Sequence, residues 1–136
     1  MPVEALPKVT IVWPTEVDWQ DKPIKVIYLA GPFRADTQWK IIQNVRRAEE
    51  ASLKLWKIGY IVICPHTMTQ NFQGECPDYV WLDGCIELLK RCDAIFLMRN
   101  YKQSIGSLEE LKVAQELGLA IIYEEPPNLP PHPKDS

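Results

Sequence analysis

The sequence predicts one three-layer α/β domain built on a mostly parallel sheet of four to five strands. Short apolar runs rich in β-branched and aromatic residues alternate with longer amphipathic runs, which is typical of βαβ units. The length of 136 residues leaves room for one compact domain and excludes a second folded unit. With 46% apolar and 24% charged residues, the chain has the composition of a protein that buries an ordinary core.

Four short runs are the predicted strands of this sheet, because each is bounded by Gly, Pro, Asn or charged residues. They lie at residues 24–30, 60–64, 93–98 and 120–123. A further edge strand is expected at residues 9–13.

Prolines mark the ends of the predicted domain. The chain contains 12 prolines, and most lie near the two termini, a composition that favours extended and weakly packed segments. We therefore expect a proline-containing N-terminal arm over residues 1–23, the domain over residues 24–125 and a proline-rich tail over residues 126–136.

Apolar residues recur at helical spacings of four and three in three stretches between the strands. The first predicted helix ends at Gly59, the second lies before Asp93, and the third spans residues 108–117 and ends at Gly118. The first stripe consists of Ile41, Val45, Ala48, Ser52 and Leu55, and the second of Leu82, Ile86 and Leu89.

Three loops are expected to hold the chemistry of such a domain. Ligands of open parallel sheets bind beyond the carboxyl ends of the strands. In this sequence, residues 31–36, 65–78 and 99–107 follow the first three predicted strands and converge at that edge.

The charge balance argues against two classes of partner. The net charge of −3 provides no basic excess for a nucleic acid polymer, and no apolar stretch approaches the ~20 residues of a membrane span.

Residues 1–12 lack the features of a secretory signal, so we expect a cytoplasmic protein. The four cysteines are then expected to be thiols rather than a disulfide framework.

The strongest local signal is the run at residues 104–110, Ser-Ile-Gly-Ser-Leu-Glu-Glu, which opens the third predicted helix. Backbone N–H groups at a helix start, beside Gly106 and the hydroxyls of Ser104 and Ser107, can hold an anion or a phosphate. The alternative is a capping box in which Ser107 caps the helix and Glu110 reaches back, and spacing alone favours this cap.

Helix geometry separates the two neighbouring glutamates of this run. At about 100° per residue, Glu109 falls on the solvent side and Glu110 on the side of the sheet. A carboxylate that faces inward at the ligand-binding edge is costly unless it has a partner or a function. Glu110 is therefore a candidate functional residue.

The turn that leaves the first strand carries two further candidates. Gly31 permits a tight turn, and Arg34 can hold a phosphate or a carboxylate. The alternative is an ordinary turn with a solvated arginine. For Tyr28, on the strand itself, a packed aromatic is the favoured interpretation of the residue alone.

Metal binding is disfavoured by spacing. Cys64, His66 and Cys76 are ligand types that zinc uses, but they form no C-x-x-C pair. We expect no metal and no cofactor, and His66 is interpreted as a polar loop residue near the ligand. Residues 72–81, which include Asp78, suit either stacking on a flat ring or plugging a long loop onto the domain.

Three motifs together resemble the nucleoside 2-deoxyribosyltransferase superfamily, which includes the 2'-deoxynucleoside 5'-phosphate N-hydrolases. They are residues 28–34 (Tyr-Leu-Ala-Gly-Pro-Phe-Arg), residues 92–93 (Cys-Asp) and the spacing Ser104-x-Gly106-x-x-x-Glu110-x-x-x-Ala114. The similarity spans about residues 25–122 and is closest to a small bacterial and phage branch that has a Pro-His-Thr stretch, here residues 65–67.

The resemblance implies a flavodoxin-like fold and cleavage of an N-glycosidic bond through a covalent sugar–enzyme intermediate. Glu110 matches the nucleophile, and Tyr28 matches a tyrosine that orients it. Arg34, Ser104 and Gly106 match residues that hold a 5'-phosphate. Asp93 is expected to be structural. The implied ligand is a nucleoside or nucleoside 5'-monophosphate, and the implied assembly is a homodimer or larger homo-oligomer.

One position departs from the pattern of these relatives. Cys85 occupies the place of a carboxylate that helps protonate the departing base, and a thiol is a poor donor for it. Asp83 or Asp78 is the expected substitute. The alternative function is a non-catalytic nucleotide-binding module on the same fold. The sequence leaves open the base, the sugar, and hydrolysis versus transfer.

Overall fold

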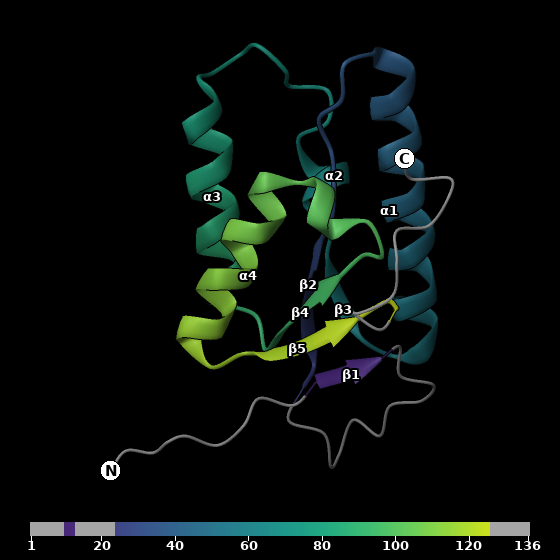
Figure 1. Ribbon diagram of the computed structural model, residues 1–136, viewed down its shortest axis with the longest axis vertical. Helices are drawn as coiled ribbons and strands as arrows, with labels where there is room; N and C mark the ends of the chain where they lie inside the picture. The colour runs from purple at the N-terminus through teal and green to yellow at the C-terminus, as the bar shows by residue number, and fades with distance from the viewer. Residues whose placement is uncertain (1–9, 13–23, 126–136) are drawn as a thin grey trace.

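Five parallel strands form the middle layer of the structure, a computed structural model that describes residues 10–12 and 24–125 (Figure 1). The hydrogen-bonded order across the sheet is β1-β5-β4-β2-β3. The bounds are β1 (Thr10–Val12), β2 (Val26–Ala30), β3 (Ile61–Ile63), β4 (Ala94–Leu97) and β5 (Ala120–Tyr123). The four predicted strands are confirmed, and the expected edge strand is β1, which pairs with β5. The rest of the predicted arm and the tail lie outside the described residues.

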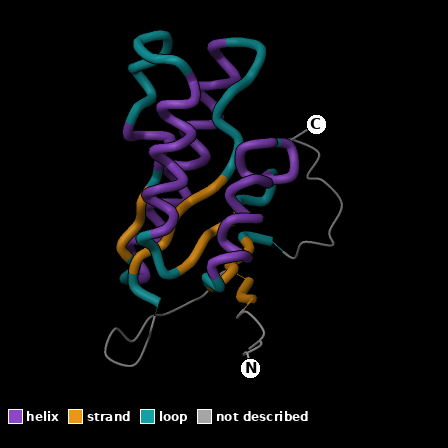
Figure 2. Tube along the Cα trace, turned by 90° about the vertical axis from the view of Figure 1, so that its left-hand side faces the viewer, coloured by secondary structure: helices purple, strands orange, loops and turns teal. Residues whose placement is uncertain are grey.

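Helices cover both faces of the sheet, as predicted. In the described part of the chain they are α1 (Gln38–Ile58), α2 (Pro65–Met68), α3 (Asp78–Lys90), the short 3-10 helix η1 (Tyr101–Gln103) and α4 (Ile105–Leu117). Figures 1 and 2 show α1 on one face and α3 beside α4 on the other. This arrangement confirms the three-layer, flavodoxin-like α/β architecture.

Two features of the helices were not predicted from the sequence. The short helices α2 and η1 lie inside segments predicted to be loops, because a helix of one turn is too short to show an apolar period. In addition, α4 begins at Ile105 rather than at Leu108. Its first turn carries a serine and a glycine instead of an apolar stripe, so the periodic pattern starts later than the helix.

Alternation along the strands divides the core into two clusters. On β2, Ile27 and Leu29 pack in the cluster under α1, whereas Tyr28 and Ala30 pack in the cluster under α3 and α4. Successive side chains of a strand point to opposite faces, so the position of Tyr28 in the chain sends its ring toward α4. Tyr28 is completely buried.

Local side-chain contacts fix where the elements begin and end. The Thr37 hydroxyl accepts a hydrogen bond from the backbone N–H of Lys40 and caps α1. Gly118 ends α4 with a left-handed φ of 77°, a conformation that glycine adopts without strain. The Asp93 carboxylate accepts hydrogen bonds from the backbone N–H groups of Lys25 and Val26, both at 2.9 Å, which confirms its structural role.

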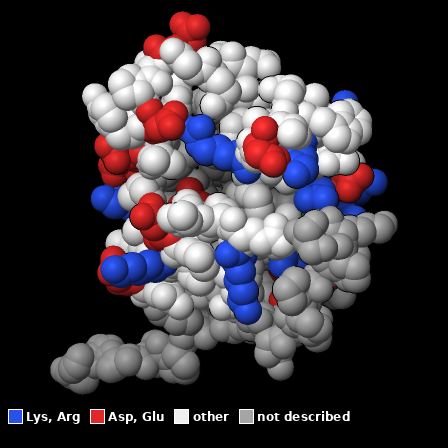
Figure 3. All heavy atoms as spheres, turned by 45° about the horizontal axis from the view of Figure 1, so that its top comes forward, with Lys and Arg blue, Asp and Glu red and all other residues white. Residues whose placement is uncertain are grey.

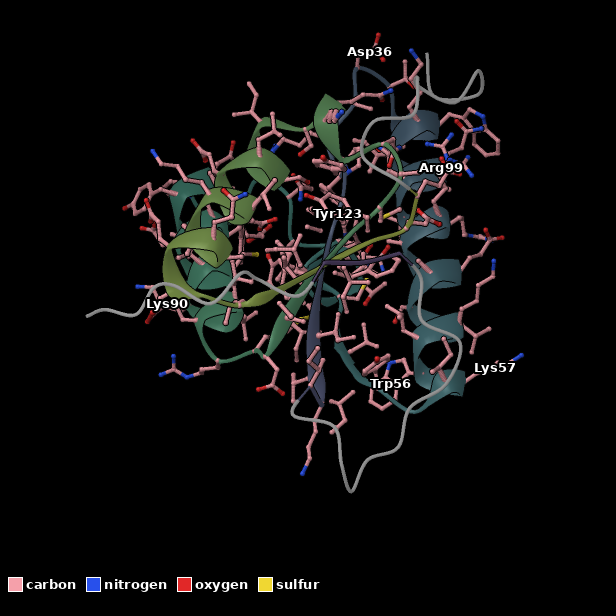
Figure 4. All side chains as sticks on the ribbon, turned by 60° about the horizontal axis from the view of Figure 1, so that its bottom comes forward. Asp36, Trp56, Lys57, Lys90, Arg99 and Tyr123 are labelled. Carbon is pink, nitrogen blue, oxygen red and sulfur yellow. The ribbon has the colours of Figure 1, made fainter. Side chains whose placement is uncertain are left out.

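The strand order places a switch point between β2 and β4. From β2 the chain crosses through α1 to β3 on one side, and then returns through α3 to β4 on the other side. Crevices at such reversals, beyond the carboxyl ends of the strands, are the usual ligand sites of open α/β sheets. In Figure 4, Asp36, which follows β2, lies at the opposite end of α1 from Trp56 and Lys57.

The surface shows charges of both signs. On the face drawn in Figure 3, acidic and basic side chains are interspersed rather than gathered in one basic patch. Within residues 10–12 and 24–125, no helix combines the length and the apolar character that a membrane span requires.

Candidate active site

The carboxylate of Glu110 and the hydroxyl of Tyr28 meet in the wall of the crevice. The Tyr28 hydroxyl donates a hydrogen bond of 2.5 Å to Glu110 Oε2, although the two residues are 82 positions apart in the chain. Tyr28 comes from β2 and Glu110 from the second turn of α4, on the side that faces the sheet, whereas Glu109 is exposed. The predicted inward orientation of Glu110 is therefore confirmed.

Burial changes the acidity of both groups. Burial raises the pKa of Glu110 from 4.5 to about 7, and the hydrogen bond from Tyr28 opposes this shift by stabilising the carboxylate. Burial and the neighbouring charge of Glu110 raise the pKa of Tyr28 far above its usual range, so the phenol stays protonated and remains a donor. Near neutral pH, Glu110 is poised between its neutral and ionised forms.

The start of α4 corrects the predicted capping box. Ser104 is the N-cap residue, and its Oγ accepts a hydrogen bond of 3.1 Å from the backbone N–H of Ser107. Ser107 therefore lies inside the helix and does not cap it. Because the helix starts one turn earlier than the box requires, Glu110 is too far from the N-cap to reach back and pairs with Tyr28 instead.

Two residues of this first turn leave room and polar groups for a ligand. A Cβ at Gly106 would meet only Ser104 Oγ, at an ordinary 3.8 Å, so packing within the protein does not require glycine there. The Oγ of Ser107 is buried and has no hydrogen-bond partner among the residues that the structure describes. Both residues line the same cavity as Glu110.

The turn after β2 is held from several sides. A Cβ at Gly31 would lie 2.3 Å from Met98 Sδ, so any side chain at this position would force Met98 to shift. The buried His66, on α2, places Nε2 at 3.1 Å from the Gly31 carbonyl and 3.0 Å from the Pro32 carbonyl. Carbonyls only accept, so Nε2 carries the proton, and burial lowers the pKa of His66. His66 thus lies in a short helix rather than in a loop.

Arg34 and Asp78, both predicted to contact substrate, contact each other. Arg34 Nη2 lies 2.8 Å from Asp78 Oδ1, and both side chains are more than half exposed. Arg34 lines the cavity, whereas Asp78, in the first turn of α3, does not. An exposed ion pair of this kind contributes only about 0–1 kcal/mol, so a ligand anion can compete for Arg34.

The structure does not bring Asp83 to the cavity. Asp83 is exposed and lies two residues from Cys85 on α3, a rotation of about 200° that points it away from the sheet. Cys85 instead lines the cavity with Tyr28 and Glu110. Burial raises the pKa of the Cys85 thiol, so it stays protonated. The expectation that Asp83 substitutes for the missing acid is therefore not supported by its position.

The aromatic residues of the segment 72–81 lie partly in the loop and partly in the first turn of α3. Phe72 packs against Trp81 with ring centroids 6.1 Å apart, which anchors the long loop as a plug. Trp81 in turn lines the cavity, and its indole Nε1 is buried without a hydrogen-bond partner among the described residues. Tyr79 is exposed and does not line the cavity.

These residues enclose a cavity of about 450 Å³, within the range of small-molecule sites. Eight of the ten predicted site residues line it, and Asp78 and Asp83 do not; the eight are Tyr28, Gly31, Arg34, His66, Ser104, Gly106, Ser107 and Glu110. Sequence reasoning missed Gln73 and Gln103, although both fall in loops expected at this edge. Asn44 was also not identified from the sequence. It does not line the cavity, but it is a polar residue buried on α1, and its Nδ2 donates to the Phe33 carbonyl.

The described residues contain no cluster of three or more His, Cys, Asp or Glu side chains suited to a metal ion. All four cysteines are free thiols: Cys64, Cys76, Cys85 and Cys92.

Residues 25–123 match the model of a family described as a domain of unknown function, DUF4406. No curated protein matches the sequence. Among solved structures, the chain is similar to a 2-deoxyribosyltransferase from the psychrotolerant bacterium Bacillus psychrosaccharolyticus, with a TM-score of 0.54 and 23% identity over 72% of this chain and 70% of that chain. This likeness confirms the α/β fold.

A second solved structure is a 2-desoxiribosyltransferase from Leishmania mexicana, with a TM-score of 0.45 and 23% identity over 73% of this chain. The matched region covers 63% of that chain, which is less than two thirds of its length.

Proposed function

We propose an enzymatic function for this chain, which belongs to the DUF4406 family: cleavage of the N-glycosidic bond of a nucleoside or nucleoside 5'-monophosphate, by hydrolysis or by transfer to a second base. The proposal rests chiefly on one observation, the Tyr28–Glu110 pair at the wall of the cavity. The fold likeness to a protein described as a 2-deoxyribosyltransferase also supports it.

Glu110 is the proposed nucleophile. Its Oε1 attacks C1' of the sugar as the bond from C1' to the base nitrogen breaks, and the electron pair of that bond leaves with the base. An ester forms between C1' and Glu110. Water or a second base then attacks C1', which breaks the ester and restores the carboxylate, the two-step logic of retaining glycosidases. Tyr28 orients the carboxylate during both steps, because its hydroxyl donates a hydrogen bond to Oε2 and leaves Oε1 available for attack.

The polar groups of the cavity wall supply proposed binding contacts. Arg34 and the first turn of α4, with Ser104 and Ser107, are suited to the sugar or its 5'-phosphate. Trp81 presents an aromatic surface suited to the base. Asp78 acts indirectly through its ion pair with Arg34.

The decisive experiment is a measurement of free-base release by chromatography. The panel contains ribo- and deoxyribonucleosides and their 5'-monophosphates, with the variant Glu110→Gln beside the wild type. We expect release by the wild type and at least about a 10³-fold loss in Glu110→Gln, because a neutral amide is a much weaker nucleophile than a carboxylate. Asp83→Asn is the matched control, since Asp83 is exposed and outside the cavity, and it should retain wild-type activity. Undiminished release by Glu110→Gln would refute the mechanism.

A non-catalytic nucleotide-binding module is the second candidate, and Cys85 is the observation that favours it. A buried, protonated thiol replaces the acid expected beside the departing base. A binder would release no base, would be stabilised against heat by nucleotides, and would keep this stabilisation in Glu110→Gln.

Assembly is part of the proposal. Apolar side chains are exposed on α3, including Tyr79 and Leu82, of which Leu82 also lines the cavity. We propose that a second copy of the chain covers this surface in a homodimer or larger homo-oligomer, within the cytoplasm. Light scattering coupled to size exclusion tests the subunit number. Membership of the small bacterial and phage branch also stays a prediction.

A further inference from the structure

Three consecutive carbonyls of the turn after β2 point to buried side chains rather than to backbone N–H groups. His66 Nε2 donates to the carbonyls of Gly31 and Pro32, at 3.1 and 3.0 Å. Asn44 Nδ2 donates to the next carbonyl, that of Phe33, at 3.1 Å. Asn44 and His66 are two of the few buried polar residues among those described. Both side chains thus form hydrogen bonds with the same short segment of backbone, residues 31–33.

The donors come from two different helices, whereas the turn itself belongs to neither. Asn44 lies in α1 and His66 in α2, and the edge of the His66 ring also faces the Phe33 ring, with centroids 6.1 Å apart. From the sheet, Met98 closes the remaining side by filling the space where Gly31 lacks a side chain. Turns without backbone hydrogen bonds are ordinarily mobile, and these contacts hold this one on three sides.

The turn forms part of the cavity wall and ends at the residue proposed to bind a ligand anion. Residues 31–34 all line the cavity, and the turn ends at Arg34. Tyr28 lies three residues before Gly31 on the same strand, so the turn connects the residue that orients Glu110 to the residue suited to a phosphate. A shift of the turn would move Arg34 relative to Glu110.

We propose that His66 and Asn44 are positioning residues that lock the turn at residues 31–34 and thereby set the distance from Arg34 to the Glu110 carboxylate. The functional part of this inference rests on the proposed glycosidic activity. His66 acts through the turn, because its Nε2–H is occupied by two carbonyls. Its Nδ1 is buried and has no hydrogen-bond partner among the described residues.

The test compares variants that keep or remove each donor. His66→Phe keeps a ring and removes the N–H, whereas His66→Gln keeps an N–H at similar reach. Asn44→Leu removes the second donor at similar volume. Thr67→Val is the matched control, because the Thr67 hydroxyl donates to the Cys64 carbonyl within the same short helix and not to the turn.

Two readouts are needed. Hydrogen exchange followed by mass spectrometry reports on residues 31–36 without requiring activity, and we expect faster exchange there in His66→Phe and Asn44→Leu but not in Thr67→Val. In base release, kcat/KM should fall about 10- to 100-fold in His66→Phe, since misplacement by about 1 Å costs this much. His66→Gln should recover to within about threefold of wild type. The double variant should be little worse than the poorer single variant, because both donors hold one turn.

Several outcomes would overturn the inference. Unchanged exchange at residues 31–36 in His66→Phe would show that the turn holds without His66. An equal effect of Thr67→Val would assign the loss to α2 as a whole. A KM increase that His66→Gln fails to rescue would indicate direct contact with substrate. If the wild type releases no base, the proposed function fails, but the exchange measurement still decides whether the turn is locked.

Discussion

The Tyr28 hydroxyl lies 2.5 Å from Glu110 Oε2 and joins the first long strand of the sheet to the last helix. This hydrogen bond supplies a donor to a carboxylate that burial would otherwise keep neutral. Because the phenol stays protonated, the contact persists when Glu110 ionises.

The pH dependence of turnover should report the acidity of Glu110. The nucleophile must be ionised, and its pKa is raised to about 7, so kcat/KM should rise with pH through a midpoint near 7 and level off above about 8. In Tyr28→Phe, the hydrogen bond that lowers the pKa of Glu110 is lost, so the midpoint should move to higher pH. Tyr60→Phe, which alters a buried tyrosine in the cluster under α1, should leave the midpoint unchanged. A midpoint that stays fixed in Tyr28→Phe would contradict this account.

Stability should depend on pH through the same group. The folded-state pKa of Glu110 lies above its ordinary value of 4.5, so its contribution to stability is full below pH 4.5 and is lost as pH rises through about 7. Glu110→Gln lacks this loss and should be more stable than wild type at pH 8, by about 1–3 kcal/mol, but not at pH 4. Denaturant unfolding at the two pH values measures the difference. A Glu110→Gln variant less stable than wild type at pH 8 would argue against a carboxylate whose ionised form is destabilised by burial.

The Arg34–Asp78 ion pair should tune the preference for phosphorylated substrates. Asp78→Asn frees Arg34 and removes a negative charge near a bound phosphate, so KM for a 5'-monophosphate should fall about two- to fivefold. KM for the parent nucleoside should not change. Asp36→Asn breaks a comparable exposed pair with Lys40, 3.1 Å long and outside the cavity lining, and serves as the control. Equal effects on both substrates would mean that Arg34 does not meet the phosphate.

The leaving base should decide the rate, because the buried Cys85 thiol is a poor proton donor. A 7-methylpurine nucleoside, whose base departs without being protonated, should react at least about 10²-fold faster than its parent. Cys85→Asp should narrow this ratio, and Cys85→Ser should not. Parallel rates for the two nucleosides in the wild type would indicate that another group donates the proton.

The variant Gly106→Ala should affect protein stability and ligand binding in opposite directions. An Ala at this position meets only Ser104 Oγ at 3.8 Å and improves helix propensity by about 0.5–1 kcal/mol, so Gly106→Ala should be as stable as wild type or more so. If a ligand approaches the first turn of α4, the added methyl group should weaken it. Thermal unfolding with and without a nucleoside 5'-monophosphate measures both effects. Undiminished stabilisation by the nucleotide would place the ligand elsewhere.

Regular patterns made most of the fold predictable. Short apolar runs mark the strands and a 3.6-residue period marks the buried stripe of α1, and both are features of the local sequence. Gly59 and Gly118 mark the ends of their helices as expected. The inward side of Glu110 also follows from helix geometry. Where the period is absent, prediction failed: α2 and the first turn of α4 have no apolar repeat, and the capping box was assigned to Ser107 instead of Ser104.

The sequence by itself determined which residue types are available at each loop and on which side of its element each one lies. Only the tertiary structure decided the pairings, because they join residues far apart in the chain: Tyr28 with Glu110, Arg34 with Asp78, and His66 with the carbonyls of Gly31 and Pro32. Such contacts depend on strand order and on how helices pack across the sheet, and no local period encodes either.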